Sequence, residues 1–134
     1  MFTYKNSRYF RPRDGAIYDY DRPIPLDRSL GGLTHGATLA IVFPGTLRTL
    51  RKQKEGKILQ YGERVWGIER VSQAIEKTEQ FFQSLGLSTR LSQEKIGDTT
   101  ITEIENRFNE RNAAFGEAKN VTGSVAREIL ESCK

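Results

Sequence analysis

The chain has 134 residues, of which 37% are hydrophobic and 28% are charged, and its mean hydropathy is −0.58. A chain of this length forms one domain of ~100 to 150 residues, with or without a tail, and the composition excludes a disordered or membrane-embedded protein. The net charge of +4 permits contact with nucleic acid. Charge alone identifies no partner, and we do not favour nucleic-acid binding.

The compartment is predicted from what the sequence lacks. Its longest apolar run, residues 39–43, is far shorter than the ~20 residues needed to span a bilayer. The first residues have neither the basic region nor the apolar stretch of a secretory signal. The single cysteine, Cys133, cannot form an internal disulfide, which fits a reducing compartment. We therefore expect a cytoplasmic protein that does not enter a membrane.

Residues 1–31 differ in composition from the rest of the chain. They contain six of the thirteen aromatic residues and three of the four prolines. Proline removes a backbone donor and pushes the preceding residue out of the helical region, and neither a helical nor a strand period persists here. Residues 13–15 resemble a turn, and residues 16–20 can form a short strand. We expect an irregular N-terminal arm.

From His35 onward the pattern of apolar residues is helical. Residues 38–53 carry apolar side chains at three- and four-residue steps. Pro44 should kink or split this helix, because its ring displaces the backbone bond to residue 40. A second helix is predicted over residues 54–66, with Gly67 as its C-terminal cap. The basic residues where the two helices meet are interpreted as a solvated face rather than an anion site: Arg48, Arg51, Lys52, Lys54 and Lys57.

Three further helices complete the prediction. Residues 69–85 have the clearest apolar stripe and stop at Gly86. After a connector with one turn beyond Ser92, residues 100–112 begin at a capping box formed by Thr100 and Glu103, and Asn120 or Thr122 caps residues 121–132. The buried side chains of the last four helices are predicted to be Ile58, Tyr61 or Gly62, Val65, Trp66, Val71, Ala74, Ile75, Thr78, Phe81, Phe82, Leu85, Ile101, Ile104, Phe108, Val125, Ile129 and Leu130. The fold class is all-α, with about five helices and no sheet of consequence.

The usual chemical motifs are absent from this sequence. It has no glycine-rich phosphate loop and no second histidine or cysteine at metal-ligand spacing. The only histidine, His35, lies between turn-forming glycines just before an apolar run. Because a metal or acid–base site needs several converging groups, the residues alone favour a packing role for His35.

Three blocks of sequence carry a resemblance to a known family. They are residues 34–44 (THGATLAIVFP), 57–66 (KILQYGERVW) and 81–87 (FFQSLGL). In this order and spacing they resemble the C-terminal part of the iron-containing (group III) alcohol dehydrogenases, in their NAD(P)H-dependent butanol dehydrogenase and aldehyde reductase branch. The likeness runs from about residue 32 to residue 134. The chain is thus divided into an arm unlike the family, residues 1–31, and a helical domain, residues 32–134.

The resemblance implies a metal-dependent alcohol–aldehyde chemistry. Such enzymes have an N-terminal α/β domain that binds NAD(P)H, an all-helical C-terminal domain, and a divalent iron or zinc ion in the cleft. The metal polarises the substrate oxygen while hydride passes to or from the nicotinamide. The family's ligands are one aspartate and three histidines, and His35 matches the last histidine. The family's histidines fourteen and ten residues upstream fall on Asp21 and Pro25, and the remaining ligands and the cofactor domain would precede residue 1.

The resemblance therefore implies part of an oxidoreductase that is inactive by itself. One imidazole holds a divalent metal too weakly, and without a nucleotide no hydride is available, so we expect the chain alone to bind neither cofactor. The alternative is a helical interaction module. In that case helices that have lost a neighbour dock either a second copy of the chain or a complementing cofactor-domain chain.

Overall fold

The computed structural model describes residues 11–13, 16–18 and 33–134. Five α-helices lie within the described residues, which confirms the predicted all-α fold. They are α2 (His35–Thr49), α3 (Glu55–Tyr61), α4 (Val71–Ser84), α5 (Asp98–Glu110) and α6 (Gly123–Glu131). Two short helical turns join them: the π-helical η2 (Gly62–Trp66) directly follows α3, and the 3-10 helix η3 (Leu91–Glu94) lies between α4 and α5.

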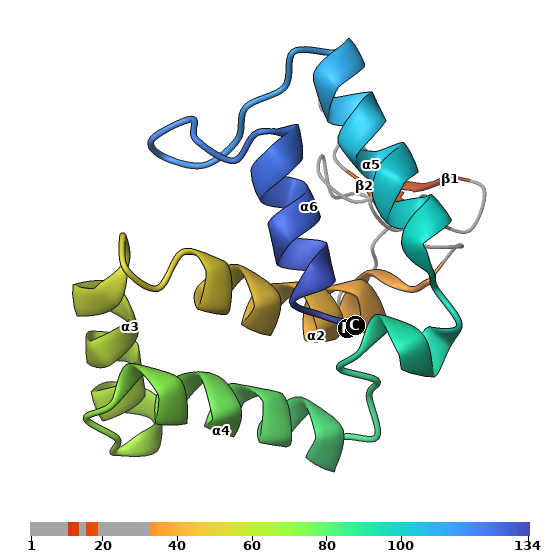
Figure 1. The fold of residues 1–134 in the computed structure, drawn as a ribbon. Helices are drawn as coiled ribbons and strands as arrows, with labels where there is room; N and C mark the ends of the chain where they lie inside the picture. Colours follow the sequence, from red (N-terminus) through yellow and green to blue (C-terminus); the bar gives the residue numbers. More distant parts are fainter. Residues whose placement is uncertain (1–10, 14–15, 19–32) are drawn as a thin grey trace.

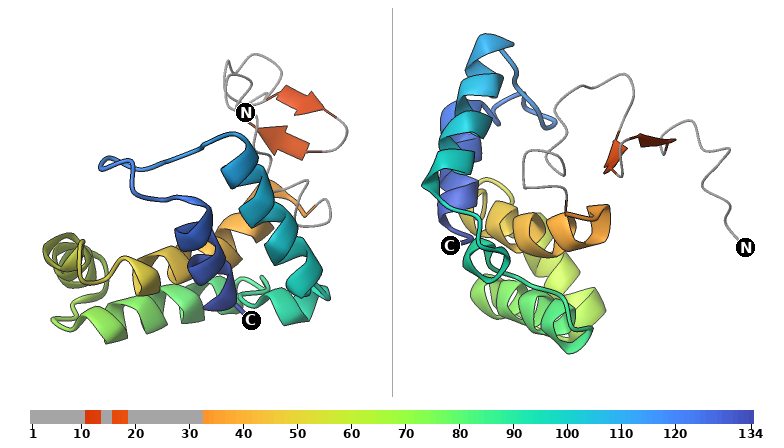
Figure 2. Two further views of the ribbon diagram at one scale, coloured as in Figure 1. Left: turned by 45° about the horizontal axis from the view of Figure 1, so that its top comes forward. Right: turned by 90° about the vertical axis from the view of Figure 1, so that its right-hand side faces the viewer.

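Helix α2 lies in the middle of the helical domain. Helix α4 runs antiparallel to α2 on one side, and α5 and α6 lie next to each other on the opposite side (Figures 1 and 2). Helix α3 and η2 close the corner between the end of α2 and the start of α4. The central position of α2 agrees with its sequence, because residues 36–47 include no charged side chain and a helix that is apolar on all sides is usually buried.

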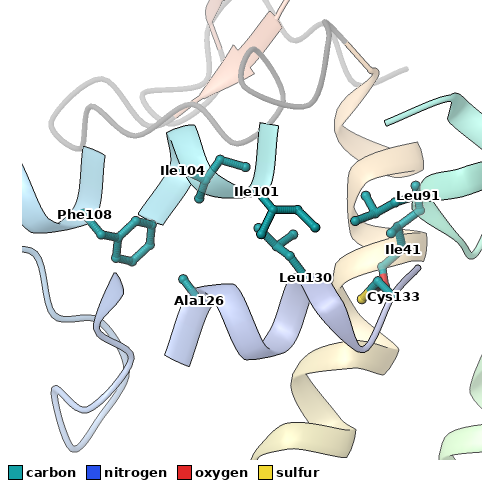
Figure 3. Close-up of a cluster of buried hydrophobic side chains, with 8 residues drawn as sticks. All are labelled: Ile41, Leu91, Ile101, Ile104, Phe108, Ala126, Leu130 and Cys133. Carbon is teal, nitrogen blue, oxygen red and sulfur yellow. Dashed lines mark hydrogen bonds between the residues drawn. The ribbon is translucent and has the colours of Figure 1, made fainter. Parts of the chain in front are cut away.

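The larger of two hydrophobic cores lies between α2, α5 and α6 (Figure 3). The apolar stripe predicted for residues 100–112 is confirmed here, since Ile101, Ile104 and Phe108 are all buried. From α6, the predicted Leu130 joins this core and Ile129 is also buried. The complete cluster is Ile41, Leu91, Ile101, Ile104, Phe108, Ala126, Leu130 and Cys133.

The smaller core lies between α3 and α4 and consists of Ile58, Ala74 and Ile75, with Leu47 and Val71 partly buried against it. The stripe predicted for residues 69–85 is buried only in its first two thirds. Phe81 is 44% exposed and Leu85 is 59% exposed, so the prediction that they are buried is wrong. Phe81 and Leu85 lie on the last part of the stripe, which no other described element covers.

Pro44 does not split the first helix, because residues 35–49 form one continuous helix that contains it. The following glycine has a steric role. A Cβ on Gly45 would lie 2.2 Å from Cys133 Sγ and 3.0 Å from the Ile129 carbonyl oxygen. The glycine therefore permits the close approach of α2 and the C-terminal end of α6.

The second predicted helix is present as α3 followed by η2, and Gly67 caps it in the left-handed conformation with φ of 66°. Ile58 and Gly62 are buried as predicted, but Val65 is 55% exposed. In the π-helical turn the backbone closes wider rings than in an α-helix, which changes the direction of successive side chains relative to the 3.6-residue period. A prediction based on that period therefore misplaces Val65.

Two of the predicted helix caps are not formed. Helix α5 begins at Asp98 after Gly97, so Thr100 already lies inside the helix and makes no capping box with Glu103. Helix α6 begins after Thr122, as one of the two predictions had it, but the Thr122 hydroxyl does not bond a backbone amide of the first turn. It lies 3.1 Å from the Ser124 hydroxyl instead.

Within the predicted arm the structure describes a two-stranded antiparallel hairpin, β1 (Arg11–Arg13) and β2 (Ala16–Tyr18), and β2 contacts α2. The predicted strand over residues 16–20 is thus present in its first three residues. The turn residues 14 and 15, and the remainder of residues 1–31, lie outside the described residues. No described helix has the length and apolar character needed to cross a membrane.

Candidate metal-ligand position and its surroundings

His35 is the first residue of α2 and is half-buried. Thr34 precedes it with an extended backbone and caps the helix, since its hydroxyl oxygen accepts a hydrogen bond from the Ala37 amide at 3.3 Å. Threonine is a favoured residue at this position because its side chain replaces a missing helical acceptor. The cap fixes where the helix starts, and hence the position of the imidazole.

The opposite end of α2 is fixed by a charged cluster formed by Arg48, Glu79 and Arg90. Arg48 Nη1 lies 3.1 Å from Glu79 Oε2, and Arg90 Nη2 lies 3.0 Å from Glu79 Oε1. Both guanidinium groups also donate to the Ser132 carbonyl oxygen, at 3.0 and 3.2 Å. The cluster joins α2, α4, the segment before η3 and the end of α6, so it anchors the far end of the helix that begins with His35.

This cluster changes the interpretation of the basic run at residues 48–57. Arg51, Lys52 and Lys57 are exposed, as a solvated face requires. Arg48, in contrast, belongs to the charged cluster, and Lys54 pairs with Glu117. The solvated-face prediction therefore holds for three of the five residues.

The described part of the chain contains no group of three or more histidine, cysteine, aspartate or glutamate side chains that could hold a metal ion. Asp21 and Pro25, the positions that the family resemblance aligns with upstream histidines, lie outside the described residues. Cys133 is buried in the main core and its thiol donates to the backbone carbonyls of Ile41 and Ile129, at 3.3 and 3.1 Å. The thiol is thus part of the packing between α2 and α6.

An apolar strip follows His35 along α2. Leu39 is 47% exposed and Phe43 is 40% exposed, and side chains four residues apart share one face of a helix. The opposite face of the same turns is buried, since Ala40 and Ile41 have no exposed surface. The imidazole and the two apolar side chains therefore adjoin a surface that the described residues leave open.

Two ionisable groups near the end of α6 have shifted pKa values. Burial raises the pKa of the Cys133 thiol, with hydrogen bonding by Ser132 and the charges of Arg48 and Arg90 acting in the opposite direction. A hydrogen bond and the positive charge of Lys134 lower the pKa of the Asp98 carboxyl. Asp98 is fully exposed, so its ion pair contributes little to stability. Neither group lies at His35.

Sequence patterns did not predict the cluster around Glu79. Arg48 and Glu79 are 31 residues apart in the sequence, and glutamate in an amphipathic helix is ordinarily placed on the solvated side. A sequence signal was nevertheless present in α4. Glu79 directly follows Thr78 on the buried side of the stripe, where a carboxylate requires a positively charged partner.

The sequence is similar to those of an aldehyde reductase and of several alcohol or butanol dehydrogenases, although no family model matches it. It is 36% identical over 113 residues to the NADPH-dependent aldehyde reductase YqhD of Escherichia coli, covering 79% of this chain and 29% of that protein. It is 40% identical over 101 residues to the NADP-dependent alcohol dehydrogenase 3 of Entamoeba histolytica, covering 74% and 26%. The NADH-dependent butanol dehydrogenase A of Clostridium acetobutylicum is 32% identical over 84 residues, 54% of this chain and 22% of that protein.

The fold agrees with these similarities. The crystal structure of E. coli YqhD superposes with a TM-score of 0.72 at 36% identity, covering 79% of this chain and 31% of the YqhD chain. The chain spans less than a third of the length of each of these relatives. The helical part of this chain is therefore a relative of the iron-containing (group III) alcohol dehydrogenases and corresponds to their C-terminal helical domain, in the branch of the aldehyde reductases and butanol dehydrogenases.

Proposed function

We propose that this chain supplies one metal ligand, His35, and the helical wall of the active site to an NAD(P)H-dependent oxidoreductase that interconverts alcohols and aldehydes. The position of His35 carries the proposal. It is the first residue of a capped helix that is anchored at its far end, in a segment similar to dehydrogenases named for NADPH, NADP or NADH. A neutral imidazole in a fixed position is a suitable ligand for iron or zinc.

The described residues do not complete a metal centre. His35 supplies one imidazole, whereas the family resemblance implies four ligands. Among the described residues, no three histidine, cysteine, aspartate or glutamate side chains come close enough together to hold a metal ion. A single ligand does not retain a divalent ion. We therefore propose that the chain has no dehydrogenase activity alone, and we assign no catalytic step to its own side chains.

In this proposal the other ligands and the nucleotide site come from outside these 134 residues. The chain covers 29% of the length of the E. coli aldehyde reductase, and the open strip formed by Leu39 and Phe43 lies directly beside His35. A complementing cofactor-domain chain would cover that strip and bring the other ligands to the imidazole. The division of the chain at about residue 32, and a cytoplasmic location in which Cys133 stays reduced, belong to the same proposal.

A chimeric enzyme tests this function. The part of E. coli YqhD that is homologous to residues 32–134 is replaced by those residues, and NADPH oxidation with a short aldehyde is measured in the presence of zinc or iron. We expect activity from the chimera and none from the isolated chain. A folded chimera that binds NADPH without reducing aldehydes would contradict the proposal.

A His35→Ala substitution in the chimera separates ligation from folding. Loss of a direct ligand should lower metal affinity beyond the about 10- to 100-fold effect of losing an outer-shell partner. Metal content after dialysis measures this, and the thermal midpoint of the metal-free chimera shows whether the fold is intact. His35→Ala with unchanged metal content would exclude His35 as a ligand.

A further inference from the structure

Thr38 differs from two other threonines that lie inside helices. The hydroxyls of Thr46 in α2 and Thr78 in α4 donate to the carbonyl oxygen four residues earlier, at 2.9 and 2.8 Å, which is a common bond for a threonine in a helix. Thr38 is only 3% exposed, yet its Oγ1 is buried without a hydrogen-bond partner among the described residues. Because an unsatisfied buried hydroxyl lowers stability, Thr38 Oγ1 requires a further partner.

Thr38 lies beside the proposed metal ligand. It follows His35 by three residues in α2, and residues three apart are neighbours on a helix, with Cβ atoms about 5 to 6 Å apart. The Thr38 side chain also tilts toward His35, because the Cα–Cβ bonds of a helix point toward its N-terminus. The Nδ1 atom of His35 is itself buried. One buried water molecule can therefore bond both Thr38 Oγ1 and His35 Nδ1.

The hydroxyl occupies a position where the surroundings favour an apolar side chain. Thr38 is on the buried side of α2, as are Ile41 and Gly45. A valine has nearly the same shape as threonine and would leave no polar atom unsatisfied in this place. Packing alone thus gives no reason for a hydroxyl here, whereas a bond to a group beside His35 does.

We propose that Thr38 positions the imidazole of His35 through one buried water molecule, which accepts from Nδ1–H and bonds the Thr38 hydroxyl. A metal-binding histidine almost always donates its second ring N–H to a carboxylate, a carbonyl or a water molecule. The nitrogen that donates keeps its proton, so Nε2 carries the lone pair that binds a metal. This inference deepens the proposed function and rests on it, because the tautomer has a role only if His35 is a ligand.

The tautomer of His35 in the full chain tests this arrangement. His35 is the only histidine, so labelling with ¹⁵N-histidine gives a single pair of ring nitrogens. Above the pH at which their chemical shifts stop changing, the imidazole is neutral and the shifts report which nitrogen carries the proton. We expect the Nδ1–H form to predominate, although free histidine favours Nε2–H. A predominant Nε2–H form in the unmodified chain overturns the proposal.

Substitutions test the part played by the hydroxyl. Thr38→Val should lower the ratio of Nδ1–H to Nε2–H at least about threefold, the effect of losing one hydrogen bond, and Thr38→Ser should restore the ratio. Thr46→Val is the matched control, since it removes a hydroxyl of the same helix that bonds the Val42 carbonyl, and it should leave the ratio unchanged. Circular dichroism shows whether each variant is folded. A ratio that Thr38→Val leaves unchanged, or that Thr46→Val changes equally, overturns the assignment.

The bridging water is observed without any substitution, so the test does not depend on how the variants fold. A buried water molecule exchanges slowly enough to give nuclear Overhauser cross-peaks at the water frequency. We expect such cross-peaks to the His35 Hδ1 proton and to the Thr38 hydroxyl proton. Cross-peaks from His35 Hδ1 to another side chain, with none to water, overturn the proposal.

Zinc affinity of the chimera separates this inference from the proposed function. Thr38→Val should weaken zinc binding about 10- to 100-fold, the effect of losing an outer-shell partner, while Thr38→Ser and Thr46→Val stay within about threefold of the unmodified chimera. Competition with a chelator of known affinity measures this without catalysis. If His35→Ala loses zinc and Thr38→Val does not, the proposed function stands and the positioning role is wrong. Unchanged zinc binding in both variants overturns the proposed function and this inference together.

Discussion

The two sides of α2 differ in how completely the chain buries its apolar residues. On the side of α5 and α6, eight side chains form one continuous core that includes Ile41 from α2. On the side of α4, the buried cluster contains only Ile58, Ala74 and Ile75. Phe81 and Leu85, which continue the same helical stripe, are exposed. The α5–α6 side is therefore covered within this chain, while the α3–α4 side leaves apolar side chains exposed.

The side chains on the two sides of α2 should therefore contribute differently to stability and to interaction. Side chains of the main core contribute to the free energy of unfolding by burial, whereas exposed apolar side chains contribute mainly when a second surface covers them. Substitutions on the two sides should therefore affect different measurements. The following predictions are ordered from the largest expected change in stability to the smallest.

Ile104→Ala in α5 should produce the largest loss. Ile104 has no exposed surface and lies in the main core, so the deletion leaves a cavity and should lower the free energy of unfolding by about 2 to 5 kcal/mol. Ile75→Ala in the smaller core is the matched comparison and should cost less, because fewer neighbours surround it. Urea unfolding measures both. Equal losses at the two sites would show that the cores are equally well packed.

Glu79→Gln should destabilise the junction between the two sides. The substitution removes the negative charge that Arg48 and Arg90 share, and loss of hydrogen bonds to charged groups at a buried site costs about 1 to 3 kcal/mol. Glu76→Gln, at an exposed position one turn earlier in α4, is the control and should have little effect. If both variants unfold at the same urea concentration as the unmodified chain, the cluster does not stabilise the fold.

The Cys133 thiol should make stability fall at alkaline pH. Burial raises the pKa of Cys133 in the folded chain, so above about pH 8.5 the unfolded thiol loses its proton while the folded thiol keeps it. Proton release then favours unfolding by at most about 1.4 kcal/mol per pH unit, up to the pKa of the folded state. The difference in unfolding free energy between the unmodified chain and Cys133→Ala, measured from pH 7 upward, isolates this effect. A difference that does not change with pH would contradict it.

Leu85→Gln should change stability least. Leu85 is 59% exposed, and substitutions at such surface positions usually stay within about 0.5 kcal/mol. Thermal unfolding of dilute protein gives the value. A loss comparable to that of Ile75→Ala would indicate that Leu85 is covered within the monomer, and the two sides of α2 would then be more alike than the structure shows.

Much of the helical fold was predictable from local patterns. The five helices, the buried stripe of α5, the glycine cap at Gly67 and the position of His35 near the start of a helix all follow from periodicity and turn chemistry. The family resemblance supplied the proposed role of His35, which the residues alone did not indicate. Whether His35 ligates a metal remains the proposal that the chimera tests.

The failed burial predictions on α4 have a physical cause. Periodicity shows which side chains lie on one face of a helix, but it does not show whether another element covers that face. Phe81 and Leu85 were therefore assigned to the core although they are exposed. The Glu79 cluster depends on segments that meet only in the folded chain, as Arg48 and the Ser132 carbonyl do across 84 residues. No local rule contains that information.

The contact between α2 and the end of α6 has a consequence for synthesis on the ribosome. Cys133 lies 92 residues after Ile41, whose carbonyl accepts from its thiol, and the Leu91 amide donates to the Cys133 carbonyl at 2.8 Å. Contacts of such long sequence separation form late, because the loop between them must first be closed. Until residue 133 has been translated, the nascent chain carries the uncharged segment 36–47 of α2 with one side uncovered, and in that interval it should be a preferred client of chaperones that bind apolar segments.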